Sequence, residues 1–284
     1  MISRRAALLP LAAPARRYQF GAHCWVYASK LPGYDPYPAL DEIFSDCAAA
    51  GAAGVELMHQ VFLAHDDGAA KVREASKKHG IACWGSSYSG NMWDAAQTAQ
   101  ILKDVRRLCE GLRSVSAAVL GLSAGDARRR KTGAELDAQA ACLREIFRLA
   151  RENGIEPNLH NHTYEVRDNE HDLSGTLARL PEAKLGPDFN WLLRGGVDPI
   201  GFIRRHGTRI VYAHLRNQDA AGRWTEDLAT GVMDYSRIGR ALAEMNAPVR
   251  RMSVELAFER DFTPERPLGE SIRRSIDFAK RTLV

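Results

Sequence analysis

Long apolar runs are missing from this sequence of 284 residues. A membrane-spanning helix needs about 20 consecutive apolar residues, and no stretch approaches that length, so no membrane partner is expected. Strong charge of one sign is also missing. The formal net charge is +4, and the basic clusters, such as residues 128–131, are short and carry no interleaved aromatic residues. Such clusters are usually solvated faces, so no nucleic-acid partner is expected.

Paired cysteines and phosphate-binding loops are absent as well. The cysteines are odd in number and none form a C-x-x-C pair, which argues against a disulfide framework and a thiolate zinc cluster. Buried cysteines that act as small apolar residues are the better interpretation. They are Cys24, Cys47, Cys83, Cys109 and Cys142. No G-x-G-x-x-G or G-x-x-x-x-G-K-[ST] pattern follows an early strand, which disfavours an open, doubly wound sheet.

The first 17 residues are set apart from the rest of the chain. Paired arginines in Ser3-Arg4-Arg5 precede a short apolar stretch that ends in Ala13-Pro14-Ala15. This order resembles a twin-arginine export signal, which would place the protein in the periplasm. A disordered tail on a cytoplasmic protein is the alternative, and the two are left open. Both interpretations exclude residues 1–17 from the fold.

From residue 18 onward, short β-rich runs alternate with longer segments of helical periodicity. No proline- or serine-rich linker divides them. Eight such units in about 265 residues predict one parallel α/β domain, a (β/α)8 TIM barrel over residues 18–284. The expected strands are Tyr18–Cys24, Gly54–Met58, Ile81–Ser87, Ser116–Leu122, Ile155–His160, Lys184–Phe189, Ile210–His214 and Met252–Glu255. The expected helices include Pro38–Ala50, Gly68–His79, Asp94–Gly111, Ala134–Asn153 and Ser271–Leu283.

Four polar residues end the last four predicted strands. They are His160, Asp188, His214 and Glu255, and they are separated by 28, 26 and 41 residues, each about one βα unit. In such barrels the carboxyl ends of the strands carry the chemistry, so these side chains are expected to converge. A carboxylate in an otherwise apolar strand also needs a partner. The set predicts a divalent metal site, with Mn²⁺ first and Mg²⁺, Co²⁺, Fe²⁺ or Zn²⁺ as alternatives.

Further candidates lie beside these ligands. Glu255 is the first candidate base, with His162, Glu165 and Glu56 as other acid–base groups. The alternative for His162 and Glu165 is a hydrogen-bonded loop scaffold. The candidate substrate-binding residues are His23, Trp25, Trp191 and Arg216. Arg216 suits an oxyanion or a neighbouring acid, and a tryptophan suits the apolar face of a sugar, although any one tryptophan is more often part of a core.

Five segments resemble motifs of the xylose-isomerase-like barrel superfamily of sugar phosphate isomerases and epimerases. Residues 54–57 (G-V-E-L) resemble its second strand, and residues 153–165 (N-G-I … H-N-H-T-Y-E) resemble its fifth. Residues 188–199 (D-F-N-W … G-V-D-P) are similar to its "D-x-x-W … G-x-D-P" segment. Residues 209–217 and 231–235 resemble "R-[IV] … H-x-K-D" and "G-x-x-D-[WF]". The resemblance covers nearly the whole chain after residue 17.

The resemblance implies a metal-dependent enzyme for α-hydroxy-carbonyl sugars, with His160, Asp188, His214 and Glu255 as ligands. Many epimerases of the superfamily carry glutamate at the position of His160, so a mechanism with two proton-exchanging glutamates lacks one of its carboxylates here. Arg216-Asn217 also replaces the usual Lys-Asp. The H-N-H-x-x-E form looks like relatives that dehydrate keto-inositols or eliminate from 3-keto-glycosides.

Four functions follow in order of preference. The first is an isomerase or epimerase that removes the proton α to the ketone of a keto-sugar or sugar phosphate. The second is a lyase or dehydratase that shares this step and then expels a β-leaving group. An abasic-site endonuclease and a non-catalytic sugar-binding barrel rank well behind. A small sugar is the expected partner, and assembly into a homo-oligomer is left open.

Overall fold

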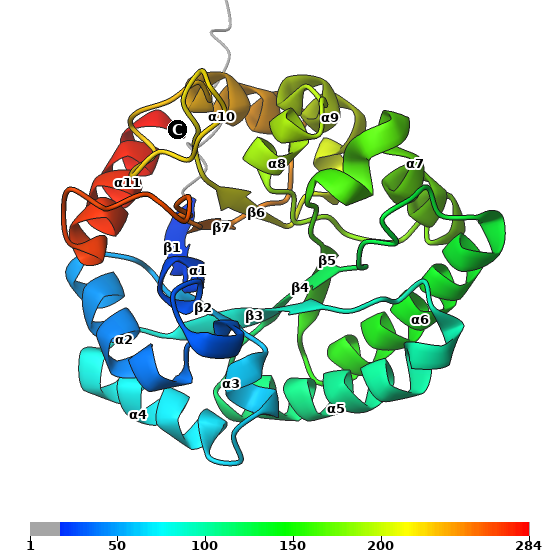
Figure 1. The fold of residues 1–284 in the computed structure, drawn as a ribbon, viewed down its shortest axis with the longest axis horizontal. Helices are drawn as coiled ribbons and strands as arrows, with labels where there is room; N and C mark the ends of the chain where they lie inside the picture. The colour runs from blue at the N-terminus through cyan, green and yellow to red at the C-terminus, as the bar shows by residue number, and fades with distance from the viewer. Residues whose placement is uncertain (1–17, 284) are drawn as a thin grey trace, which may run out of the picture.

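The computed structural model describes residues 18–283, so the predicted signal or tail at residues 1–17 lies outside the described residues. Parallel strands occupy the centre and helices surround them (Figure 1). The sheet order is β5-β4-β3-β2-β1-β7-β6. The strands are β1 (Gln19–His23), β2 (Val55–Met58), β3 (Cys83–Ser89), β4 (Val119–Ser123), β5 (Glu156–Leu159), β6 (Tyr212–Leu215) and β7 (Arg251–Val254). This arrangement confirms the predicted barrel.

The segment 184–188 closes the barrel between β5 and β6. Leu185 forms single parallel bridges to Leu159 and Ile210, and Asp188 forms one to His214. The prediction of a regular strand over Lys184–Phe189 is therefore wrong, although the backbone of this segment still closes the barrel. Pro187 has no N–H to donate. At Gly186 an added Cβ would lie 1.8 Å from Oδ1 of Asn158, so the backbone passes close to β5 there.

The helices form the outer ring of the barrel, and several begin or end at recognisable capping residues. Helix α6 begins at a capping box, in which Thr132 and Glu135 exchange side-chain and backbone hydrogen bonds. Helix α4 ends at Gly80, whose φ of +67° is left-handed. The helices are α1 (Trp25–Ala28), α2 (Leu40–Ala49), α3 (Gln60–Leu63), α4 (Gly68–His79), α5 (Thr98–Ser114), α6 (Gly133–Glu152), α7 (Thr163–Arg179), α8 (Phe189–Arg194), α9 (Pro199–His206), α10 (Tyr235–Glu244) and α11 (Leu268–Thr282). Short 3₁₀ helices are η1 (Pro32–Tyr34), η2 (Tyr37–Ala39), η3 (Ala95–Gln97) and η4 (Gly207–Arg209).

The core lies between the strands and the inner faces of the helices. Val55, Leu57 and Val254 on the strands are buried together with Ile43 and Ile276 on the helices. All five cysteines are buried and free, as predicted. Among the described residues, no helix is long and apolar enough to cross a membrane.

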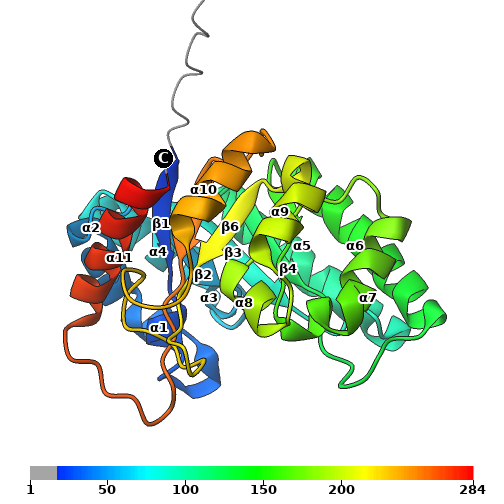
Figure 2. The ribbon, with the colours of Figure 1, turned by 90° about the horizontal axis from the view of Figure 1, so that it is seen from above.

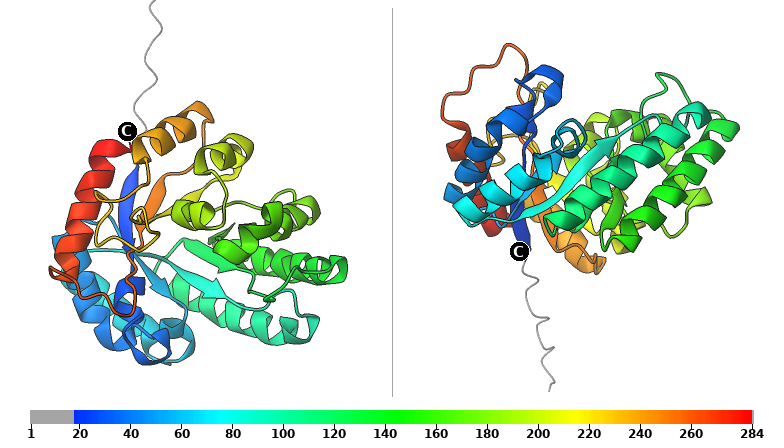
Figure 3. Two further views of the ribbon diagram at one scale, coloured as in Figure 1. Left: turned by 45° about the horizontal axis from the view of Figure 1, so that its top comes forward. Right: turned by 90° about the horizontal axis from the view of Figure 1, so that it is seen from below.

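The segments that follow β1 and β7 lie side by side at one end of the barrel. Figures 2 and 3 show α1, drawn in blue, beside the long orange-to-red segment between β7 and α11. Because the strands are parallel, the connections that leave their carboxyl ends meet at this end. The predicted site residues therefore have to be sought here.

Candidate active site

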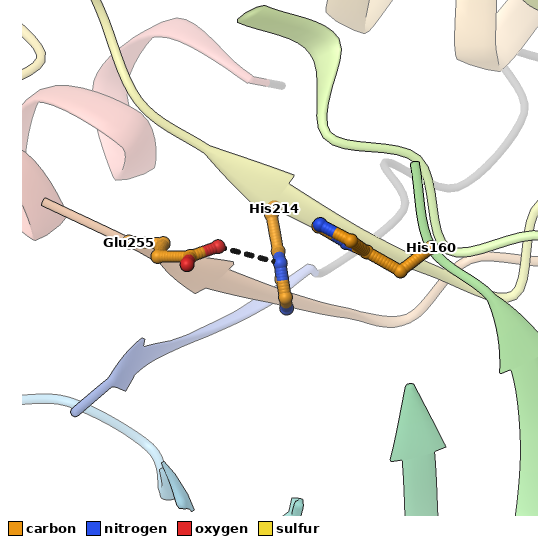
Figure 4. Close-up of side chains that lie close together, drawn as sticks. All are labelled: His160, His214 and Glu255. Atoms are coloured by element: carbon orange, nitrogen blue, oxygen red, sulfur yellow. Dashed lines mark ion pairs between the residues drawn. The ribbon is translucent and has the colours of Figure 1, made fainter. Parts of the chain in front are cut away.

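Three of the four predicted metal ligands lie together. His160 directly follows β5, His214 lies in β6, and Glu255 directly follows β7. Their candidate ligand atoms all lie within 4.8 Å of one another, and all three residues are buried. In Figure 4 the His214 ring lies between the Glu255 carboxylate and the His160 ring.

The two sides of the His214 ring are held differently. Its Nε2 is hydrogen-bonded to Oε2 of Glu56 at 2.8 Å. Its Nδ1 lies 2.7 Å from Oε2 of Glu255, but this ion pair lacks hydrogen-bond geometry, and both atoms are left without a hydrogen-bond partner. Glu56 therefore fixes the ring from behind, whereas Nδ1 is directed into the site.

The carboxylates determine the charge of this cluster. Burial by itself lowers the pKa of His214, but the negative charges of Glu56 and Glu255 outweigh it and raise that pKa to about 10. Burial raises the pKa of Glu255, whereas Arg216, His23 and His214 together bring it well below its ordinary value. In the metal-free protein His214 is thus an imidazolium between two carboxylates at neutral pH.

The donor set suits a divalent metal. Burial, with the neighbouring His214 and His162, lowers the pKa of His160 well below its ordinary value. The imidazole is therefore neutral and can offer a lone pair, and its buried Nδ1 has no hydrogen-bond partner. Two imidazoles and a carboxylate are ligands that Mn²⁺, Fe²⁺, Co²⁺ and Zn²⁺ accept.

Asp188, the fourth predicted ligand, is engaged elsewhere. Its Oδ1 accepts hydrogen bonds from the backbone N–H groups of Asn190 and Trp191 and so caps α8. Its Oδ2 lies 2.6 Å from Nε of Arg216, a close ion pair without hydrogen-bond geometry. The ligand role of Asp188 stays a prediction, and it requires Arg216 to yield this oxygen to the metal.

Arg216 occupies the centre of the site and is almost fully buried. Its Nη2 lies 2.6 Å from Oε2 of Glu255, so one guanidinium links Asp188 to Glu255. The guanidinium carbon lies 5.4 Å and 5.0 Å from the ring centroids of Trp191 and Trp224. Sequence alternation placed Arg216 on the same side as His214, and the shared contact with Glu255 agrees with that prediction.

A cleft of about 630 Å³ opens above this cluster. Glu255, Arg216 and His162 line it beside the cluster. Ser29, Lys30, Glu259 and Arg260 add further polar groups, and six aromatic residues form much of the remaining wall. The volume is typical of small-molecule sites, which span about 300–1,000 Å³. The lining residues are Trp25, Ser29, Lys30, Tyr34, His162, Trp191, Arg216, Trp224, Glu255, Ala257, Phe258, Glu259, Arg260 and Phe262.

His162 and Glu165, which the sequence paired, occupy different environments. The His162 side chain is one-third exposed and lines the cleft, with its ring 4.8 Å from that of His160. Glu165 is buried, where it accepts hydrogen bonds from Ser123 Oγ at 2.6 Å and from the His162 backbone N–H at 2.7 Å. These contacts support the scaffold role at the start of α7, which the sequence left open for Glu165.

Glu56 and His23 lie behind the cleft and do not line it. Glu56 is fully buried, and its Oε2 also accepts a hydrogen bond from the Tyr212 hydroxyl. Nδ1 of His23 accepts the backbone N–H of Trp25 and lies 3.8 Å from Glu255. Neither residue reaches the cleft directly. A role of Glu56 in catalysis, or of His23 in substrate binding, would therefore have to act through His214 or Glu255.

Tyr34, Trp224 and Phe258 are among the cleft residues that sequence reasoning missed. Trp224 follows β6 and Phe258 follows β7, so both lie in connections at the carboxyl ends of strands. Position after a predicted strand was therefore the available signal for these two. Tyr34 lies in η1, in the connection after β1, and its exposure is visible only in the structure.

The chain belongs to the xylose isomerase-like TIM barrel family, whose model matches residues 44–282. A search of curated proteins finds no match. Among solved structures, a sugar phosphate isomerase/epimerase from Parabacteroides distasonis is similar, with a TM-score of 0.73 and 14% identity over 98% of both chains.

Two further solved structures share the fold. A D-allulose 3-epimerase from Methylomonas sp. has a TM-score of 0.75 and 15% identity, covering 94% of this chain and 99% of its own. A probable 3-DHS dehydratase from Bacillus anthracis has a TM-score of 0.68 and 15% identity, covering 92% and 97%. At these identities the likeness establishes a shared fold.

Proposed function

We propose that this member of the xylose isomerase-like TIM barrel family is a metal-dependent sugar isomerase or epimerase that removes the proton α to a substrate ketone. The observation that carries the proposal is the group of His160, His214 and Glu255, of which Glu255 also lines a cleft with several aromatic residues in its wall. The fold neighbours agree with this class, since they include a D-allulose 3-epimerase in complex with D-allulose.

His160, His214 and Glu255 would hold the metal, and Asp188 would join them if Arg216 released it. A divalent cation at this position would polarise the ketone and its neighbouring hydroxyl and so acidify the adjacent C–H. The two imidazoles favour a transition ion, with Mn²⁺ as the first candidate. Arg216 would remain close enough to stabilise negative charge that develops on a substrate oxygen.

Two residues of the cleft can exchange protons with the substrate. Glu255 lines the cleft and is ionised at neutral pH, which suits the base that takes the α proton. His162 also lines the cleft, is partly exposed, and can return the proton. Glu56 and Glu165 are already committed to buried hydrogen bonds, which leaves His162 as the second group.

Metal analysis of the purified protein, combined with deuterium uptake from heavy water into a panel of ketoses, tests this function. We expect stoichiometric metal and deuterium at the α carbon, with an isomer or epimer as product. A dehydrated product would assign the lyase reaction in its place. If the protein held no metal and caused no deuterium exchange, the proposal would be overturned and a sugar-binding barrel would be favoured.

Matched variants show whether the cluster is responsible. His214→Ala and Glu255→Gln are expected to abolish metal retention or turnover. His79→Ala, which changes a histidine on the outer helix α4, is expected to keep both. Full activity in both cluster variants would contradict the assignment of the site.

A further inference from the structure

The outer part of the cleft is built from aromatic residues on two connections. Trp25 and Tyr34 follow β1, and their rings lie 5.2 Å apart at 38°. Phe258 and Phe262 follow β7, and their rings lie 4.9 Å apart, also at 38°. These are the connections that lie side by side in Figures 2 and 3. Because they leave different strands, the two pairs of rings come to line one cleft only in the folded barrel.

Tyr34 is unusual in both exposure and backbone conformation. It is 49% exposed, and among the described residues the only other exposed large hydrophobic residue is Val232. Its φ is +56°, and the preceding residue, Gly33, is left-handed as well. A bulky residue with positive φ is a rare and costly conformation, and such strain is concentrated at functional sites such as ligand clamps. Folding alone would favour neither the strained backbone nor the exposed ring.

The cleft is larger than a single sugar ring would fill. At about 630 Å³ it is comparable to sites that enclose drug-sized ligands, which are larger than one sugar ring. A keto-sugar bound against Glu255 and His162 would fill the polar end. The aromatic end would then be left for another part of the same substrate.

The charges around the aromatic end are mixed, and its acid Glu259 also lies 3.6 Å from Arg194. The cations Lys30 and Arg260 are accompanied by the acid Glu259. Nζ of Lys30 lies 6.0 Å from the centre of the Phe258 ring. Recognition of a phosphate typically uses a fork of arginine donors or a helix N-terminus, whereas the two cations here stand on separate connections beside four aromatic rings.

We propose that Trp25, Tyr34 and Phe258 form a subsite for a second ring, so that the substrate is a glycoside rather than a free ketose or a sugar phosphate. The C–H-rich face of a pyranose and the face of an aryl aglycone both pack on aromatic side chains. This inference rests on the proposed function, because it places the reacting keto-sugar at the metal end. It adds that the group attached to that sugar supplies part of the binding energy.

Binding of unreactive probes tests the subsite without requiring turnover. Isothermal titration calorimetry would compare glucose, glucose 6-phosphate, maltose and phenyl β-D-glucoside on the wild-type chain. We expect maltose or phenyl glucoside to bind about three- to tenfold more tightly than glucose. This gain in affinity is the size expected from one aromatic contact. A preference between these two probes identifies the second ring as a sugar or an aryl group.

Single substitutions show which residues cause the difference in affinity between the two-ring probes and glucose. Tyr34→Ala and Phe258→Ala should each reduce the advantage of the two-ring probe over glucose. Val232→Ala removes the other exposed hydrophobic side chain, which does not line the cleft, and should keep that advantage. Equal binding of all four probes, or tightest binding of glucose 6-phosphate, would overturn the subsite. Absence of deuterium exchange would instead refute the proposed function, so the two failures are distinguishable.

Discussion

Glu56 and His214 are joined by a buried 2.8 Å hydrogen bond, although 158 positions separate them in the chain. Glu56 also accepts the Tyr212 hydroxyl at 2.9 Å, and Tyr212 in turn contacts Ser253 Oγ at 2.7 Å. A carboxylate that accepts the second ring N–H of a ligating histidine fixes its tautomer and orientation. With His214 as a ligand, as proposed above, Glu56 acts as its positioning residue.

Replacing Glu56 should weaken metal binding rather than remove it. We expect Glu56→Gln to lower metal affinity by about 10- to 100-fold, the range typical of second partners of ligating histidines. Competition with a fluorescent chelator measures the change, and Glu74→Gln on the exposed face of α4 is the matched control. Unchanged affinity in a folded Glu56→Gln variant would remove the positioning role.

Metal binding should release a proton. His214 has a pKa of about 10 in the metal-free protein, because Glu56 and Glu255 outweigh the effect of burial. It is therefore protonated at pH 8, and a metal can bind Nδ1 only after that proton leaves. Calorimetry in two buffers of different ionisation enthalpy should report about one proton released, and affinity should rise with pH up to about 10. No proton release would contradict a ligand role for His214.

The same pKa predicts how the metal-free protein responds to alkali. The pKa of His214 is raised above the ordinary 6.5 of an unfolded histidine. Its contribution to stability is thus fully present below pH 6.5 and is lost as pH rises through about 10. Urea midpoints between pH 7 and pH 10 should fall in wild type and fall less in His214→Gln. Parallel pH profiles would contradict the raised pKa.

His162 should matter for turnover and not for the metal. It lines the cleft but is absent from the three-residue ligand group. We expect His162→Ala to retain stoichiometric metal and to lose about 10²- to 10⁴-fold in turnover, the usual contribution of a general acid or base. Metal loss in this variant would move His162 into the ligand set.

Glu165 should act mainly on stability. Its carboxylate accepts two short hydrogen bonds in a buried position, from Ser123 Oγ and the His162 backbone N–H. Glu165→Ala leaves the His162 backbone N–H unpaired, whereas Ser123 Oγ keeps its contact with the Tyr164 hydroxyl at 2.7 Å. The loss should cost about 1–3 kcal/mol of unfolding free energy. Urea denaturation measures this, with Glu152→Ala on the exposed side of α6 as control. A large loss of turnover with unchanged stability would restore Glu165 as a catalytic candidate.

The sequence by itself determined the alternation of strands and helices and the polar residue at the end of each late strand. The carboxyl ends of parallel strands meet at one end of a barrel, so His160, His214 and Glu255 could be grouped from their spacing alone. The exception was 184–188, where Gly186 and Pro187 allow closure by single bridges in place of a regular strand. Local pattern does not distinguish these two ways of closing a barrel.

Only the tertiary structure decided which partner each polar group takes. Arg216 could equally have faced a substrate or an acid, and it lies against both Asp188 and Glu255. Glu56 and Glu165 both appeared as candidate acids, yet one orients His214 and the other caps a helix. Such choices depend on distances across the barrel between side chains far apart in sequence. Periodicity specifies the face on which a side chain lies, and the packing of the closed barrel specifies what it meets there.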